Sequence, residues 1–534
     1  MHANQDSSSG LTRRSAIVKG GTALFGLSAA GLLAACGSSG SGSAGTVAAG
    51  FAGGGTPVRG GTFDAGMISA GSSETINPYL FNDGPSAMRV GVLYDKLVRT
   101  DRDLSKIVPQ LALSIEPNAD ATVWTLKLRD GVTFHDGKPF GADDVVHSFQ
   151  LWASPTVFIA SSVVSLVDVK GVRKRGPLTV EVPLVKPVAQ FPTLLTNLSI
   201  VQAGTTLEGL TKRPAGTGPF KLTSFAPGRR TVLAANEDYW EQGKPYVDQL
   251  VIDSSFADDN ARLNALLAGD INVMAGMPPL TAKQQTSSGQ VAVLRATSAA
   301  PQYFSMRIDK APFDDVRVRQ ALRLVADRQA LIDGALAGYG TVGNDLLGKD
   351  AEYFTADLVR KRDVEQARSL LKAAGKEGLS VSLRSANAFP GGVESATLFK
   401  QQAKAAGIDV KLDVVTPANY FQGASGWPYP FGQDGWSVSF GSLTAAYDGV
   451  ASLGETAWDP ARDKAVQAAI TSSDSSKAAD LWRTVQQQQF DTGGYLLWAQ
   501  PDVIDAVAKD VRGISTTIAG NLNGYRFQDG WLTS

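Results

Sequence analysis

The stretch from Tyr303 to Ile332 constrains the fold more than any other part of the chain. Residues 303–308 combine β-formers with large apolar side chains and predict a strand. A turn containing Pro312 follows, after which Asp314 and Asp315 can cap a helix and suit the positive end of its dipole. Apolar residues then recur at i, i+3, i+4 and i+7, the spacing of one buried helical face, which predicts an amphipathic helix. Four arginines fall mostly off that face: Arg317, Arg319, Arg323 and Arg328.

The composition is that of an ordinary soluble globular protein. Its 534 residues exceed what one hydrophobic core holds, so we expect two or three domains. Hydrophobic residues make up 43% of the chain and charged residues 19%, which is the usual range. A formal net charge of −1 argues against nucleic acid or an anionic membrane surface as the main partner.

The N-terminal 36 residues predict an export signal. Arg13 and Arg14 precede an apolar stretch, residues 20–35, that is short and Gly-rich for a membrane span. The arginine pair resembles a twin-arginine (Tat) signal. Ala16 stands where that motif prefers Phe, and Lys19 falls one place late, so the ordinary secretion (Sec) route remains open.

Cys36 is the only cysteine, which excludes a disulfide scaffold, a multi-cysteine metal site and a redox pair within the chain. The run Leu-Ala-Ala-Cys-Gly around it resembles the bacterial lipoprotein cleavage box, in which the thiol of the first mature residue is acylated. A buried structural cysteine is the alternative. Residues 37–60 are mostly Gly, Ser and Ala and predict a flexible tether that spans about 27 Å.

Three blocks of the sequence carry a resemblance to a known family. They are APFDDVRVRQAL from Ala311 to Leu322, WTLKLRDGVTFHDGKPFGADDVVHSF from Trp124 to Phe149, and GTGPFKL from Gly216 to Leu222. Together they resemble the extracellular solute-binding proteins of ABC transporters, in the branch (family 5) that includes dipeptide- and oligopeptide-binding proteins. The resemblance extends over nearly all of residues 61–534.

The resemblance implies an α/β fold of the periplasmic-binding-protein type: class II, two-lobed, with an accessory domain and a ligand cleft between the lobes. It also implies hinges near residues 297 and 499, about which the lobes close on a ligand. The expected domains are a signal peptide (1–36), the tether (37–60), lobe I (61–83, 214–297 and 500–534), an accessory domain (84–213) and lobe II (298–499).

No sequence motif supports catalysis, a cofactor or a metal site. Residues 338–343 fit G-x-G-x-x-G but follow a helix, where a nucleotide fingerprint follows a strand. Residues 343–349 nearly form a phosphate loop, yet Asp350 replaces the Ser or Thr that would hold magnesium. His135 matches a structural His of the family, and we expect His147 to be structural too, which leaves a Ser-His-Asp hydrolase without a base. A secreted lipoprotein hydrolase is therefore only the alternative from a different class.

The segment from Tyr420 to Tyr447 is dense in aromatic residues beside Gly and Pro, which predicts a pocket built from loops. Each ring that is buried on a ligand removes about 150–250 Å² from water. From this segment we expect ligand contacts from Trp427, Tyr429, Trp436, Tyr447 and Asp448. Outside this segment, we add Ser69 and Ser72 from the first loop, and Arg384 as the partner of a ligand carboxylate, for which a surface role without ligand contact is the alternative.

The pair Gly435-Trp436 marks a departure from the peptide-binding relatives. They usually carry an Asp a few residues after this pair, which binds the α-ammonium of the peptide, whereas here no acid follows before Asp448. Burying an ammonium without a carboxylate is costly. Either Asp434 or Asp448 substitutes for the missing acid, or the ligand has no free amino terminus, as in an uncharged oligosaccharide.

The function expected from the resemblance is capture of a peptide or similar small solute outside the cytoplasm, with delivery to the permease subunits of an ABC transporter by hinge closure. Ligand sensing without transport is open as well. The lipid on Cys36 would hold the protein on the outer face of the cell membrane. We expect a monomer that binds no nucleic acid.

Overall fold

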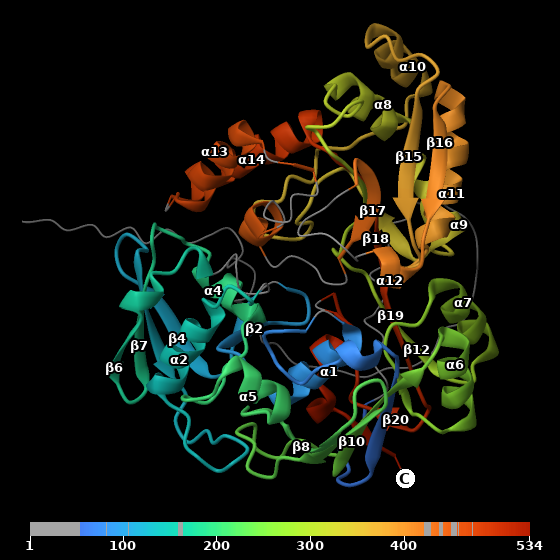
Figure 1. Cartoon of the computed structure of the whole chain (residues 1–534). Coiled ribbons are helices and arrows are strands. Elements are labelled where there is room, and N and C mark those ends of the chain that lie inside the picture. Colours follow the sequence, from blue (N-terminus) through green and yellow to red (C-terminus); the bar gives the residue numbers. More distant parts are fainter. Residues whose placement is uncertain are drawn as a thin grey trace, which may run out of the picture. The chain divides into compact units, whose positions relative to one another are not determined.

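The computed structural model describes residues 54–534 apart from 82, 105, 158–163, 421–428, 437–441, 450–455, 458, 473, 519 and 534, and only the backbone at 197, 417, 418, 448 and 449. The described residues belong to one compact unit (Figure 1). The predicted signal peptide, Cys36, most of the tether and Trp427 lie outside them. No helix among them is both long and apolar enough to cross a membrane.

A seven-stranded mixed sheet gathers strands from three separate stretches of the chain. Its order is β12 (Ala292–Ala296), β19 (Val503–Val507), β11 (Val273–Met274), β1 (Thr62–Ile68), β10 (Gln249–Phe256), β9 (Arg230–Ala235) and β8 (Phe220–Phe225). β1 runs parallel to β10 and β11, and the other pairs are antiparallel. Helices α6 (Asp259–Ala268) and α7 (Pro279–Ser288) pack against β11 and β12, respectively.

A second, six-stranded sheet carries the site described below. Its order is β14 (Gly340–Val342), β18 (Tyr495–Pro501), β13 (Gln302–Met306), β17 (Phe431–Gly435), β15 (Ser380–Ser385) and β16 (Asp409–Val414). A hydrophobic core joins this sheet to α8 (Val316–Val325), α9 (Arg328–Ala335), α10 (Val364–Ala373) and α11 (Gly392–Ala403). Helices and strands alternate here, as in α/β architectures.

A four-stranded antiparallel sheet comes from the stretch between β1 and β8. Its order is β4 (Ala112–Pro117), β5 (Val123–Leu128), β7 (Thr179–Pro183) and β6 (Arg173–Gly176), with α2 (Ala142–Trp152) packed on β6 and β7. The remaining helices are α1 (Gly84–Leu93), α4 (Phe191–Leu194), α5 (Leu207–Lys212), α12 (Pro417–Tyr420), α13 (Pro460–Ile470), α14 (Ser475–Thr492) and α15 (Leu522–Tyr525). Two short hairpin-like pairs are β2 (Val98–Thr100) with β3 (Ile107–Pro109), and β20 (Val511–Arg512) with β21 (Trp531–Leu532).

The chain passes between the seven-stranded and six-stranded sheets at two places. The first is the segment 297–301 between β12 and β13, and the second is Asp502 between β18 and β19. The residues predicted as hinges, 297 and 499, fall at or beside these crossings. The predicted domain boundaries remain a prediction.

The stretch from Tyr303 to Ile332 folds largely as predicted. β13 and α8 form where expected, and the Asp315 side chain caps α8 by accepting a hydrogen bond from the Arg317 N–H at 2.8 Å. The prediction of a single helix is wrong, because α8 ends at Val325 and a second helix, α9, begins at Arg328. Asp327 causes the break, since its side chain caps α9 through the Ala330 N–H at 3.1 Å and such a cap has non-helical backbone angles.

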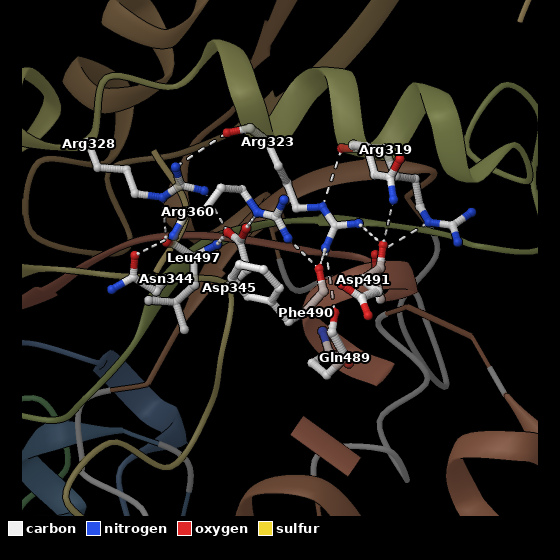
Figure 2. A network of polar contacts seen from close by, with 12 residues as sticks. Arg319, Arg323, Arg328, Asn344, Asp345, Arg360, Gln489, Phe490, Asp491 and Leu497 are labelled. Atoms are coloured by element: carbon white, nitrogen blue, oxygen red, sulfur yellow. Dashed lines mark hydrogen bonds and ion pairs between the residues drawn. The ribbon is translucent and has the colours of Figure 1, made fainter. Parts of the chain in front are cut away.

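The arginines off the apolar face of α8 are mostly buried rather than solvated (Figure 2). Arg323 is 0% exposed, and Arg319 and Arg328 are only 5% and 4% exposed. Arg319 and Arg323 are buried because the C-terminus of α14 ends against them, whereas Arg328 packs against the Leu497 carbonyl and Asp345. The last carbonyl oxygens of α14 have no partners within the helix and carry the negative end of its dipole.

Each guanidinium in this cluster meets a specific acceptor. Arg323 donates to the Phe490 carbonyl at 2.9 Å, and Arg319 donates to the Thr492 carbonyl at 3.1 Å. Asp345, fully buried, pairs with Arg328 at 2.7 Å and with Arg360 at 2.5 Å. Burial lowers the pKa of Arg323 to about 9, so the group stays charged at neutral pH.

Candidate functional site

The candidate site lies on the face of β15 and β17 that points away from α11. Side chains alternate between the two faces of a strand. On β17, Phe431 and Gln433 point to α11, where Gln433 donates to Ser395 at 3.2 Å. Asp434 therefore points to the opposite face. Arg384 on β15 does so as well, because its neighbour Leu383 lies in the core shared with α11.

Arg384 is held by an acid and an aromatic ring. Its Nη1 lies 2.5 Å from Oδ2 of Asp413, which sits opposite it on β16, and its guanidinium stacks 4.6 Å from the ring centre of Tyr429. Its Nε atom is buried and has no hydrogen-bond partner in the part of the chain that the structure describes. Hydrogen bonding to Tyr429, and then to Asp413, raises the pKa of Arg384, so its charge is secure.

A pocket of about 260 Å³ adjoins this arginine. Its walls come from the 311–313 turn, the first half of β15, and residues 429–431, with Arg384 and Asp413 among them. The Tyr429 hydroxyl donates to the Tyr420 carbonyl at 2.9 Å, and the two rings lie 5.8 Å apart. Tyr429 thus gives this charged site an aromatic wall, while Tyr420 is buried and does not line the pocket.

Asp434 adds a negative charge to the same face. It is 9% exposed, and its Oδ1 accepts a hydrogen bond from the Gly435 N–H at 2.7 Å. Burial and, next, the charge of Asp434 raise the pKa of Tyr420. The face therefore presents a cation, Arg384, and an anion, Asp434, with Tyr429 beside the cation.

Trp436 follows β17 and lies at the first crossing between the sheets. Its backbone N–H donates to the Pro301 carbonyl at 3.0 Å, and its indole Nε1 donates to the Tyr303 hydroxyl at 3.1 Å. Tyr303 is itself buried against Tyr495, with ring centres 4.7 Å apart. The half-buried indole is thereby held at the end of the sheet where the chain changes direction.

The predicted first-loop residues, Ser69 and Ser72, are both exposed. The Ser69 hydroxyl accepts a hydrogen bond from the Gly71 N–H at 3.1 Å. The loop is anchored by Glu74, whose fully buried carboxylate pairs with Arg89 at 2.7 Å. The structure does not bring these serines into contact with Arg384 or Trp436.

The other predicted contacts divide into two groups. Tyr447 is 5% exposed and packs on Trp482 with ring centres 6.1 Å apart, so its ring belongs to the core. For Asp448 only the backbone is described, in the π-helical turn η5 (Ala445–Gly449), and Trp427 lies outside the described residues. A ligand role for these residues stays a prediction.

Sequence reasoning missed Asp413 and Tyr303 as parts of this site. Asp413 lies opposite Arg384 because β15 and β16 pair in parallel, and a sequence signal for it would be the alternating apolar residues of these two neighbouring segments. Tyr303 was assigned only to a strand, and nothing in the sequence pointed to its contact with Trp436.

Both histidines of the folded part have structural partners. The ring Nε2 of His135 lies 3.0 Å from the Gly218 carbonyl, and that of His147 lies 2.9 Å from the Thr205 carbonyl. Burial lowers the pKa of His135 to about 4, so it is neutral at pH 7 and donates from Nε2. Among the described residues, no group of three or more His, Cys, Asp or Glu side chains could hold a metal ion.

Known proteins share this sequence pattern and this fold. The dipeptide-binding protein of Escherichia coli K12 is 27% identical over 490 residues, covering 83% of this chain and 90% of that protein. The fold is similar to DppA from Helicobacter pylori in complex with the peptide STSA, with a TM-score of 0.76, 22% identity, and coverage of 89% of this chain and 99% of that one. AgaA in complex with agropinic acid, from A. tumefaciens R10, also gives a TM-score of 0.76, at 23% identity and with the same coverage.

These likenesses confirm the predicted fold, a two-lobed α/β binding protein. The model of the bacterial extracellular solute-binding proteins, family 5, matches residues 106–457, which is more than half of the chain. The protein therefore belongs to that family of extracellular solute-binding proteins.

Proposed function

We propose that the protein captures a peptide outside the cytoplasm and delivers it to the permease of an ABC transporter. One observation carries this proposal: Arg384 and Asp434 place opposite charges on the same face of the six-stranded sheet. A peptide with free termini carries the complementary ammonium and carboxylate. Charge-assisted hydrogen bonds of this kind are the strong ones in recognition.

In this proposal Arg384 binds the ligand carboxylate. Its side chain is 23% exposed, so that part of the guanidinium can reach a ligand, and the ring of Tyr429 fixes the plane of the guanidinium. Asp434 binds the ammonium and thus replaces the acid that peptide-binding relatives carry after the Gly-Trp pair. Trp436 and Tyr429 supply apolar surface for side chains.

A solute without a free amino terminus is the second candidate. No acid follows Trp436 before Asp448, which favours this candidate. The structural neighbour AgaA is in complex with agropinic acid rather than a peptide. An uncharged oligosaccharide stacked on aromatic rings would likewise need no acid after Trp436.

We propose the lobe boundaries given above, with closure about the crossings at 297–301 and Asp502. A ligand that binds the closed form better shifts the population toward it, and the permease would read that form. Binding without chemical conversion, by a monomer, is part of the proposal. So is a lipid on Cys36, after Tat or Sec export, that keeps the protein on the outer face of the membrane.

Calorimetric titration with two pools of random tripeptides, one with free carboxyl termini and one amidated, tests the role of Arg384. Arg384→Ala should weaken binding of the free pool by about tenfold to a hundredfold, because a hydrogen bond to a charged group contributes about 1.5–3 kcal/mol. It should leave the amidated pool unaffected. Arg368→Ala, on α10 and ion-paired with Glu365 at 2.8 Å, is the matched control. Equal losses for both pools would refute the assignment of the carboxylate to Arg384.

A further inference from the structure

A second pocket, of about 380 Å³, shares no residue with the site around Arg384. Its size falls in the range of small-molecule sites, about 300–1,000 Å³. Six charged side chains line it: Arg99, Arg102, Lys244, Arg526, Asp101 and Asp529. Tyr246 and Trp531, with ring centres 6.0 Å apart, form an aromatic wall.

Two of the four cations are neutralised within the protein. Lys244 lies 2.6 Å from Asp529 and 2.9 Å from Glu241. Arg526 lies 2.7 Å from Asp529 and 3.0 Å from Glu241. These four side chains form a closed ring without net charge.

Arg99 and Arg102 are left without a carboxylate. Arg99 is half-buried and donates only to the Thr100 carbonyl, at 3.1 Å, and neither arginine forms an ion pair within the described ranges. Asp101 adds one carboxylate to the pocket, and its Oδ1 accepts a hydrogen bond from the Lys106 N–H at 3.1 Å, so the two arginines still exceed it by one charge. Burial and then the nearby charge of Arg526 lower the pKa of Arg99, while the charges of Glu241 and Asp529 act in the opposite direction, and an anion beside the guanidinium would favour its charged form. The pocket has an excess of guanidinium groups.

The chain enters the folded unit at this pocket. Pro57 lines it, and the Gly60 N–H donates to the Tyr246 carbonyl at 2.9 Å. Only 20 residues separate Cys36 from Pro57 in the sequence. If Cys36 carries the lipid proposed above, this pocket is therefore close along the chain to the membrane anchor.

We propose that this pocket binds the phosphate group of an anionic phospholipid, held between Arg99 and Arg102 with the headgroup against Tyr246 and Trp531. Guanidinium groups match phosphate oxygens in geometry and remain charged at all physiological pH values. Aromatic rings suit the membrane–water boundary. The inference rests on the proposed lipid anchor, which brings the pocket and the membrane together.

Vesicle co-sedimentation tests this with the mature chain from residue 36 carrying Cys36→Ser, so that no acyl chain contributes. Binding to vesicles of phosphatidylglycerol and phosphatidylcholine should exceed binding to phosphatidylcholine alone. The double variant Arg99→Ala, Arg102→Ala should lose about tenfold or more of this binding. The control variant Arg173→Ala, Arg175→Ala removes the same amount of charge from exposed residues of β6 and should bind the vesicles as well as the wild type does. Equal loss in both variants, or no preference for phosphatidylglycerol, would overturn the proposal.

A titration with glycerol 3-phosphate distinguishes the two sources of phosphate. If the wild type binds glycerol 3-phosphate and the Arg99, Arg102 double variant does not, the phosphate site is supported. If the wild type binds glycerol 3-phosphate but not vesicles, the membrane is refuted as the source of the phosphate group. The tripeptide titration of the same double variant should match wild type, because these arginines lie outside the peptide site. A failure of peptide binding in wild type would refute the proposed function and leave the vesicle result intact.

Discussion

Arg295 and Asp502 form an ion pair, with Nε 2.5 Å from Oδ2, at the two crossings between the large sheets. The Asp502 carboxylate is completely buried, and its other oxygen has no hydrogen-bond partner in the described structure. Arg295 is 32% exposed and stacks 4.4 Å from the ring centre of Tyr339, whose carbonyl accepts the Asp502 N–H at 3.3 Å. Tyr339 directly precedes β14, so the pair links strands of both sheets.

Removing Arg295 should destabilise the fold more than removing Asp502. Arg295→Ala leaves a buried, unpaired carboxylate and should lower the free energy of unfolding by about 3 kcal/mol at pH 7. Asp502→Asn should cost less, because Arg295 can reach water. Urea unfolding of both variants measures the difference. A larger cost for Asp502→Asn would contradict this account of the crossing.

Arg323 should matter far more for stability than its neighbour Arg317 on the same helix. Arg323→Met removes a buried charged donor from the Phe490 and Asp491 carbonyls at the end of α14, which keep only Arg360 and Gln320 respectively, and we expect a loss of about 2–3 kcal/mol. Arg317→Met is the matched control, since that side chain is exposed and pairs with Asp315, and should cost about 0.5 kcal/mol. Similar unfolding midpoints for the two variants would show that the buried cluster contributes little.

His135 should make the protein sensitive to acid. Its folded pKa is about 4, against 6.5 when unfolded, so the unfolded chain binds more protons between these values. Stability therefore falls as the pH drops from about 6.5 to 4, by about 3 kcal/mol for this group. His135→Gln, which can still donate to Gly218, should remove that part of the loss in urea titrations at pH 7 and pH 4.5. An unchanged pH dependence would show that the ring is not buried as described.

Asp95 should act in the opposite direction over the same pH range. Burial raises its folded pKa to about 6 from 3.8, despite hydrogen bonds from Trp240, Thr217 and Tyr239. Here the folded chain binds more protons between these values, so stability falls as the pH rises from about 4 to 6, by about 3 kcal/mol.

Asp95→Asn should therefore steepen the loss of stability on acidification, whereas His135→Gln should flatten it. The comparison uses the difference between the unfolding free energies at pH 7 and pH 4.5 for each variant. Shifts of the same sign would contradict the assignment of one of the two groups.

The sequence was most informative where local rules decide the structure. The strand β13, the Asp315 cap and the apolar stripe of α8 follow from residues close together in the chain. The burial of Arg323 does not, because it depends on the end of α14, more than 160 residues later. The contact of Arg384 with Tyr429 likewise depends on how β17 joins the sheet beside β15, which no local pattern specifies.

Aromatic density was a weaker guide to the site. Tyr429 and Trp436 lie beside the charged face of the sheet, whereas Tyr420 and Tyr447 are almost completely buried. Composition alone does not separate a ring that packs a core from one that faces a ligand, because both settings favour large apolar side chains.

The most direct test of the central claim is native mass spectrometry of the mature chain purified without added ligand, followed by release and identification of the bound species. The account predicts a mixture of short peptides with free amino and carboxyl termini, and their loss from an Arg384→Ala, Asp434→Asn variant that remains folded. A single bound compound lacking both an amino and a carboxyl group, retained by that variant, would contradict it.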